Sequence, residues 1–194
     1  PHDTCRRQRQ MCIRDSYKLE ELLNDVKKEL LKKNSNTTLV EELANSILTY
    51  SDLLPSINQN YKFDIEKFVD VNGKTGIYLQ YAQVRAGKIL NQYQTQNNKV
   101  VLDNLNEDER KLVFEITKLP YYFLKSLEKN EPHHIEEYAY SLCQILNSFY
   151  SNNKIFSSSI TETVMNQRLF IVKSFYTTIH TVFELLGMSP VNEM

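Results

Sequence analysis

The sequence predicts an all-α protein, and three observations lead to that fold class. Only 4 glycines and 5 prolines interrupt the 194 residues, which favours long helices over hairpins. Apolar residues recur at intervals of three and four along most of the chain. No segment shows the alternation typical of a strand, and no internal repeat is evident. We therefore expect a helical bundle.

The apolar stripes predict helices in order along the chain. Long helices are expected over about residues 17–33, 38–54, 76–94, 106–119, 132–151 and 161–186, with a short helical turn opened by Asp64. Thr38 is the expected N-cap of the second helix, and Glu41 three residues later would complete a capping box. Asn106 and Glu109 are expected to cap the helix over residues 106–119.

Proline and glycine predict the remaining boundaries. Pro120 should kink or break a helix just before an aromatic-rich turn over residues 121–124. Pro132 is well placed as the first residue of the next helix. Gly187 is expected to end the last helix in the left-handed conformation.

Residues 1–16 differ from the rest of the chain. They lack apolar periodicity, carry two of the three cysteines, and resemble translated sequencing-adapter read-through, so we expect a non-native segment outside the fold. A basic arm that contacts RNA is the alternative, because four arginines fall within these residues. The third cysteine, Cys143, lies in an apolar helical stripe and is expected to be a buried small hydrophobe, with no disulfide and no zinc site.

Composition limits the possible partners. The net charge of −1 gives no global basic footprint, so any RNA contact must come from a local cluster of cations. No apolar run approaches the roughly 20 residues that span a bilayer, and we expect no membrane association.

The run from Gly73 to Arg85 carries the most functional information. Gly73 and Gly76 predict a tight turn that opens a helix. Tyr81 and Arg85 are four residues apart, so both side chains lie on one helical face. An aromatic ring beside a guanidinium can stack an unpaired base and contact its phosphate or base edge, as recognition of single-stranded RNA requires. The alternative is that Tyr81 is a core residue and Arg85 a surface cation.

Three ordered blocks resemble the arginyl-tRNA synthetase family over residues 17–194. They read Phe63-Asp-Ile-Glu-Lys-Phe68 with Gly73-Lys-Thr-Gly-Ile-Tyr-Leu-Gln-Tyr-Ala-Gln-Val-Arg85, then His133-His-Ile-Glu-Glu-Tyr-Ala-Tyr-Ser-Leu142 with Asn147-Ser-Phe-Tyr150, then Gln167-Arg-Leu169 leading to Phe183-Glu-Leu-Leu-Gly-Met-Ser-Pro-Val-Asn-Glu-Met194. Ile77 stands where the family usually has proline, a change that removes no functional group.

The resemblance implies an organisation and a set of site residues. Residues 17–77 would be the end of a catalytic domain and its junction, and residues 78–194 a class Ia anticodon-binding helical bundle of the DALR type. The positions that match the family's anticodon site are Tyr81, Arg85, Tyr150 and Met194, and Lys74 and Lys88 are possible phosphate contacts. The segment after Gly187 would act as a lid over the site, held by Pro190.

No catalytic residue is predicted in this chain. None of the four histidines stands in a His-x-Gly-His motif, and no glycine-rich phosphate loop occurs. We expect a C-terminal fragment that is inactive alone, while its parent arginine–tRNA ligase would use ATP and Mg²⁺ outside this chain. His133 and His134 are adjacent on a helix, so their side chains should diverge, and no metal site is predicted.

The expected partners are tRNA(Arg) and the missing N-terminal catalytic domain, in a cytoplasmic monomer. The first alternative is a non-catalytic tRNA-binding adaptor that retained only the helical domain. A second alternative is a helical interaction module with no role in RNA binding.

Overall fold

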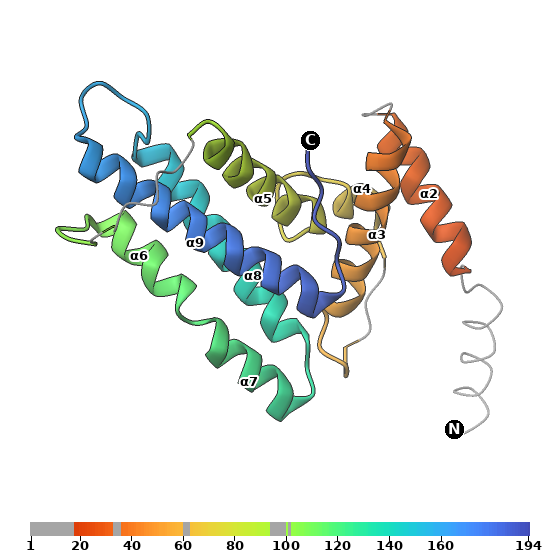
Figure 1. The fold of residues 1–194 in the computed structure, drawn as a ribbon. Helices are drawn as coiled ribbons and strands as arrows, with labels where there is room; N and C mark the ends of the chain where they lie inside the picture. Colours follow the sequence, from red (N-terminus) through yellow and green to blue (C-terminus); the bar gives the residue numbers. More distant parts are fainter. Residues whose placement is uncertain (1–17, 33–35, 60–62, 94–99, 101) are drawn as a thin grey trace, which may run out of the picture.

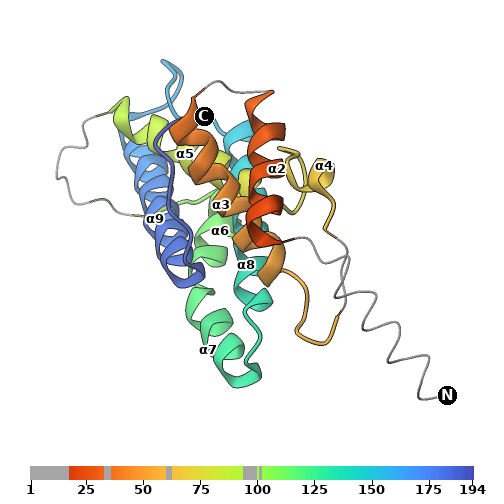
Figure 2. The same ribbon diagram turned by 90° about the vertical axis from the view of Figure 1, so that its right-hand side faces the viewer.

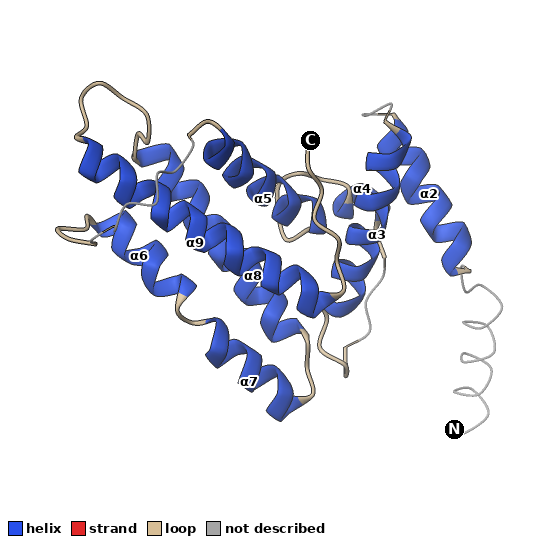
Figure 3. Cartoon of the chain, in the orientation of Figure 1, coloured by secondary structure: helices blue, strands red, loops and turns tan. Residues whose placement is uncertain are grey.

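A computed structural model describes residues 18–32, 36–59, 63–93, 100 and 102–194. The described residues form α-helices and loops without any strand (Figure 3), so the predicted all-α class is confirmed. The helices are α2 (Leu19–Leu31), α3 (Thr37–Leu53), α4 (Ile65–Phe68), α5 (Gly76–Asn91), α6 (Glu107–Ile116), α7 (Leu119–Lys129), α8 (His133–Asn152) and α9 (Glu162–Leu186).

The helices form two neighbouring groups that meet at α5 (Figures 1 and 2). In the larger group, α9 packs against α5, α6 and α8, and α7 packs along α8. In the smaller group, α2 packs against α3 and α4. Because α3 also packs against α5, the contact between α3 and α5 joins the two groups.

Each group has its own hydrophobic core. The bundle core lies between α5, α6, α8 and α9 and holds the largest buried aromatic rings, among them Tyr138, Phe149, Phe175 and Phe183. The second core, which we call the junction core, is aliphatic and comes from α2, α3, the start of α5 and the C-terminal tail. Its buried members are Val26, Leu30, Leu39, Val40, Leu43, Ala44, Ile47, Val69, Ile77, Val84 and Val191.

The tight turn predicted before α5 is confirmed. Gly73 has a φ of 121°, which favours glycine, and the Thr75 amide donates to the Gly73 carbonyl at 3.0 Å. The Thr75 hydroxyl caps α5 by accepting from the Tyr78 amide. Gly76 packs against α3 so closely that an added Cβ would lie 2.5 Å from the carbonyl oxygen of Ser46. The turn therefore fixes the position of the first residues of α5 against α3.

Several predicted helix ends are confirmed and one cap was assigned to the wrong residue. Asn106 and Glu109 form the expected capping box, and Gly187 ends α9 in the left-handed conformation with a φ of 71°. The N-cap of α3 is Asn36, whose side chain accepts from the Leu39 amide, and not Thr38. The Glu41 carboxylate pairs with Lys27 of α2 instead of closing a capping box, because α2 packs against this part of α3.

The helix break expected at Pro120 is confirmed, since α6 ends at Ile116 and α7 begins at Leu119. Residues 121–124, expected as a turn, are instead helical, because Pro120 lies in the first turn of α7, where proline is compatible with a helix. The left-handed Asn130 ends α7. Pro132 is the N-cap of α8 rather than its first helical residue.

The longest helix, α9, is the one described helix that is long and apolar enough to cross a membrane by length and composition alone. It lies inside the bundle against α5, α6 and α8, and nine of its residues are buried there. Its apolar character is therefore that of a core helix. Cys143 of α8 is fully buried as predicted, and burial raises the pKa of its thiol. Residues 1–17, with the two other cysteines, lie outside the described residues.

Candidate nucleic-acid interface

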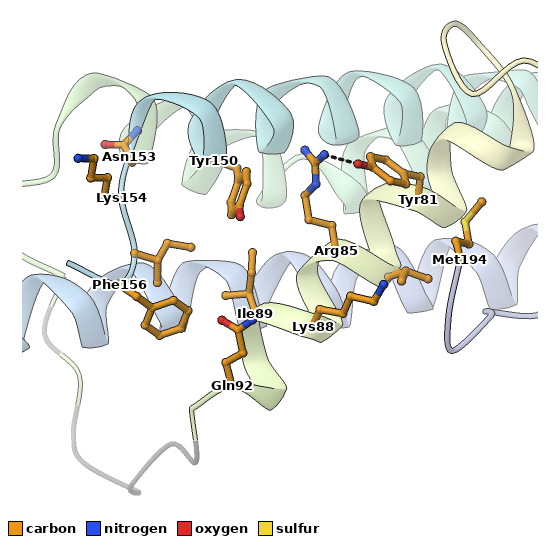
Figure 4. A pocket seen from close by; sticks show the side chains of 12 residues that line it. Tyr81, Arg85, Lys88, Ile89, Gln92, Tyr150, Asn153, Lys154, Phe156 and Met194 are labelled. Atoms are coloured by element: carbon orange, nitrogen blue, oxygen red, sulfur yellow. Dashed lines mark hydrogen bonds between the residues drawn. The ribbon is translucent and has the colours of Figure 1, made fainter.

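A pocket of about 480 Å³ opens on the surface where α5, the end of α8 and the C-terminal tail meet (Figure 4). Four of the predicted positions line it together with Lys88, namely Tyr81, Arg85, Tyr150 and Met194. The other lining residues are Val84, Ile89, Gln92, Asn153, Lys154, Ile155 and Phe156. Lys74 is not among them: it is exposed and its ammonium lies 5.6 Å from the centre of the Tyr140 ring.

Arg85 lies between two tyrosine rings at the centre of the pocket (Figure 4). Its guanidinium carbon is 4.6 Å from the centre of the Tyr81 ring and 5.1 Å from that of Tyr150. Both distances are within the range of cation–π attraction. The rings remain 39% and 43% exposed, so Tyr81 is not the core residue of the alternative interpretation.

Two hydrogen bonds orient the Arg85 side chain. Its Nη2 donates to the Tyr81 hydroxyl at 2.5 Å, and its Nη1 donates to Oδ1 of Asn147 at 2.9 Å. Asn147 in turn donates to the Tyr78 hydroxyl at 2.8 Å. Burial raises the pKa of Tyr78, so this hydroxyl is protonated at neutral pH. A guanidinium carries five N–H groups, and the two bonds hold its plane while leaving donors for a ligand.

The pocket is a local cluster of cations in a chain of net charge −1. Arg85, Lys88 and Lys154 line it, and no aspartate or glutamate is among its lining residues in the described part of the chain. Exposed aromatic rings come from Tyr81, Tyr150 and, on a loop, Phe156. Positive charge beside exposed rings is the combination that holds unpaired nucleotides by phosphate contact and base stacking.

The C-terminal tail is held over α5 by one buried glutamine. Gln80 donates from Nε2 to the Ser189 carbonyl at 2.7 Å and accepts at Oε1 from the Val191 amide at 3.1 Å. Val191 is fully buried in the junction core, whereas Pro190 is exposed. Gln80 and Val191 therefore hold the tail that carries Met194, in place of the predicted Pro190.

A partly buried ion pair holds the loop on the opposite side of the pocket. Glu109 of α6 accepts from Arg168 Nε at 2.7 Å and from Gln167 Nε2 at 3.3 Å. Arg168 also donates to the backbone carbonyl of Lys154, at the loop that brings Lys154 and Phe156 to the pocket. The Gln167-Arg-Leu block therefore positions this loop.

Sequence reasoning missed several of these residues. Asn147 is part of the Asn147-Ser-Phe-Tyr150 block, but its hydrogen bond to Arg85 could not be predicted because the two residues are 62 positions apart. Gln80 lies within the most informative run of the chain, and its periodicity gives no sign that it binds the tail. Lys154 and Phe156 fall in a loop without periodicity, where sequence offered no signal for a site.

One group of possible metal ligands occurs among the described residues, outside this pocket. It consists of Glu131, His133 and His134. The expectation that the two histidines diverge is wrong, since their ring centres are 4.0 Å apart.

The fold and the pocket together have the features of an all-α nucleic-acid-binding domain. The profile of the family described as "DALR anticodon binding domain" matches residues 79–194, which is more than half of the chain. The chain therefore belongs to the DALR anticodon-binding domain family, and membership of this family implies tRNA binding.

Curated relatives and solved structures agree with this family. The chain is 30% identical to an arginine–tRNA ligase of Francisella tularensis subsp. novicida (strain U112), over 91% of the chain and 32% of that protein. It is 28% identical to an arginine–tRNA ligase of Sulfurisphaera tokodaii, over 91% of the chain and 29% of the relative. The chain thus spans about a third of the length of the curated relatives it matches.

Two solved structures have the same fold. The arginyl-tRNA synthetase of Thermus thermophilus superposes with a TM-score of 0.80 at 23% identity, covering 91% of this chain and 31% of that one. The arginyl-tRNA synthetase of Plasmodium falciparum superposes with a TM-score of 0.77 at 26% identity, covering 90% of this chain and 32% of that one.

Proposed function

We propose that the chain recognises the anticodon of tRNA(Arg) as part of an arginine–tRNA ligase. Arg85 held between Tyr81 and Tyr150 is the observation that carries the proposal. The two exposed rings offer stacking planes for unpaired bases, and Arg85 offers N–H donors to a base edge or phosphate. Met194 closes one side of the pocket, and Lys88 lies at its rim to contact phosphate.

The proposed organisation follows the two cores. Residues 17–77 would be the end of the catalytic domain and its junction, residues 78–194 the anticodon-binding domain, and residues 1–16 a segment foreign to both. Most buried members of the junction core come from residues 17–77, which supports this division. Binding energy gathered at the anticodon would orient the acceptor end of the tRNA toward an active site supplied by the rest of the ligase.

The parent enzyme would couple arginine to tRNA with ATP and Mg²⁺, in the cytoplasm and as a monomer. The chain alone would not arginylate tRNA, because the motifs for amino-acid activation are absent from its sequence. The non-catalytic adaptor remains a second candidate because the chain spans about a third of its relatives' length. The reading frame upstream of residue 17 distinguishes the two.

The test compares the affinity of the full chain for two tRNA transcripts. One is tRNA(Arg), and the other is the same molecule with its anticodon bases exchanged for those of another amino acid. A gel shift at fixed ionic strength should show binding of tRNA(Arg) and at least tenfold weaker binding of the exchanged transcript. Equal affinity for the two transcripts would contradict anticodon recognition. Absence of binding to either would favour an interaction module without an RNA role.

A further inference from the structure

The turn between α7 and α8 brings two histidines and a carboxylate together at a corner of the bundle. One oxygen of Glu131, Oε2, lies 3.8 Å from His133 Nδ1 and 3.6 Å from His134 Nε2. The three side chains can each direct one ligand atom so that these atoms all lie within 4.8 Å of one another. Since Glu131 precedes the helix, it approaches both rings from the turn rather than from the helix face.

The cluster is largely withdrawn from water. The side chains of His133 and His134 are 14% and 11% exposed, and that of Glu131 is 23% exposed. Within the described part of the chain, the Nδ1 atoms of both histidines are buried and have no hydrogen-bond partner. A buried nitrogen without a partner costs about 1–3 kcal/mol. A ligand bound to Nδ1 of His133, the nitrogen that faces Glu131, would offset that cost at His133.

A further contact orients the carboxylate. Oε1 of Glu131 accepts a hydrogen bond from the Ser56 hydroxyl at 2.8 Å, which leaves Oε2 directed at the two histidines. Bonds of this kind fix the orientation of ligating groups in metal sites. Ser56 follows α3, on the junction side of the molecule, so the cluster also joins the two groups of helices.

We propose that Glu131, His133 and His134 bind a divalent transition-metal ion, with Zn²⁺ the best fit. Imidazole nitrogens and a carboxylate oxygen are ligands that Zn²⁺ accepts, at bond lengths of about 2.0–2.2 Å. Tetrahedral geometry at those lengths separates ligand atoms by about 3.4 Å. The separations of 3.6 and 3.8 Å from Glu131 Oε2 therefore need only a small closing movement. The fourth position would be taken by water.

The bound ion would act as a structural clip. It would tie the N-terminus of α8 to the preceding turn and, through Ser56, to the segment after α3. None of the cluster residues lines the proposed tRNA pocket, so the ion should change stability without changing the pocket.

The experiment titrates ZnCl₂ into the full chain by calorimetry at pH 7.5. His2→Gln, Cys5→Ser and Cys12→Ser form the background, because these residues are other possible zinc ligands. One equivalent of Zn²⁺ should bind, and the melting temperature with Zn²⁺ should exceed that with EDTA by a few degrees. Glu131→Gln, which can still accept from Ser56, and His133→Gln should each weaken binding at least tenfold. The matched control His180→Gln changes a histidine of α9 outside the cluster and should leave binding unchanged.

Circular dichroism establishes that each variant keeps the parent helical content. Two results would overturn the site. One is that the background chain does not bind Zn²⁺, and the other is that Glu131→Gln and His133→Gln bind Zn²⁺ as tightly as the background chain. Equal weakening by His180→Gln would also overturn it. A site lost only in the two cluster variants, with the same helical content, supports it.

Discussion

The bundle core and the junction core are built differently. The bundle core is filled by large aromatic rings, mostly from helices that follow one another closely in sequence, α5 to α9, and Tyr50 of α3 is a further buried ring. The junction core contains aliphatic side chains, and it joins α2 and α3 to Val191 at the far end of the chain. The bundle core therefore comes almost entirely from residues 79–188, with Tyr50 of α3 added, whereas the junction core closes only when α2 and α3 meet the C-terminal tail.

The place of α5 in both cores explains where the pocket lies. α5 contributes Ala82, Ala86 and Ile89 to the bundle core and Ile77 and Val84 to the junction core. The pocket opens beside this shared helix, with Tyr150 supplied by the bundle and Met194 by the tail that packs on the junction core. The shape of the pocket therefore depends on both cores.

The largest expected effect concerns a buried carboxyl between the two groups of helices. Glu136 of α8 is fully buried, and among the described residues its carboxyl oxygens have no hydrogen-bond partner. Burial raises its pKa from 4.5 to about 9, and the negative charge of Asp52 contributes. The Tyr50 hydroxyl from α3 is also buried there. Glu136 is therefore protonated in the folded protein at neutral pH.

The pH dependence follows from that shift. Between pH 4.5 and 9 the folded chain holds a proton that the unfolded chain has lost, so stability is greatest at the acid end and falls as pH rises. The slope is at most about 1.4 kcal/mol per pH unit. Glu136→Gln should flatten this slope in urea unfolding followed between pH 5 and 9. The exposed neighbour Glu137→Gln should retain it, and equal slopes for Glu136→Gln and the parent would contradict a buried proton.

Two glycines of α5, Gly76 and Gly87, differ in how tightly their surroundings are packed. Gly76 faces α3, where an added Cβ would meet the Ser46 backbone at 2.5 Å, whereas at Gly87 it would meet only the Tyr176 side chain at 3.3 Å. Gly76→Ala should therefore cost about 1–3 kcal/mol of stability, because backbone must move. Gly87→Ala should stay within about 1 kcal/mol of the parent, since a helical alanine offsets a small shift of the ring. Similar unfolding free energies for both variants would show that the junction is not tightly packed at Gly76.

How far the structure was predictable depends on the range of the interactions. Helices and the face shared by Tyr81 and Arg85 follow from local periodicity, and the Asn106 cap follows from a local motif. The Thr38 assignment failed because the polar run from Asn34 to Thr38 offers several cap candidates, and because Glu41 pairs with Lys27 of α2. Contacts of long sequence separation left no local pattern, such as those of Gln80 with the tail and Asn147 with Arg85.

The family resemblance supplied what periodicity could not. It brought Tyr150 and Met194 into one site with Arg85, and the structure places all three around one pocket. Gln80 and the Glu109–Arg168 ion pair hold the walls of that pocket, and only the structure identifies them. Helix geometry alone predicted that His133 and His134 diverge, whereas their ring centres lie 4.0 Å apart.

The affinity of Arg85→Ala for tRNA(Arg) tests the proposed anticodon site most directly. We expect a loss of about 1–3 kcal/mol in binding, with little change in melting temperature. Tyr81→Ala should lose a similar amount through stacking, about 1–3 kcal/mol per base. Arg110→Ala, which removes an exposed arginine of α6 outside the pocket, controls for net charge at the same salt concentration. If Arg85→Ala binds tRNA(Arg) as tightly as the parent while Tyr81→Ala merely lowers the melting temperature, the pocket is not the anticodon site.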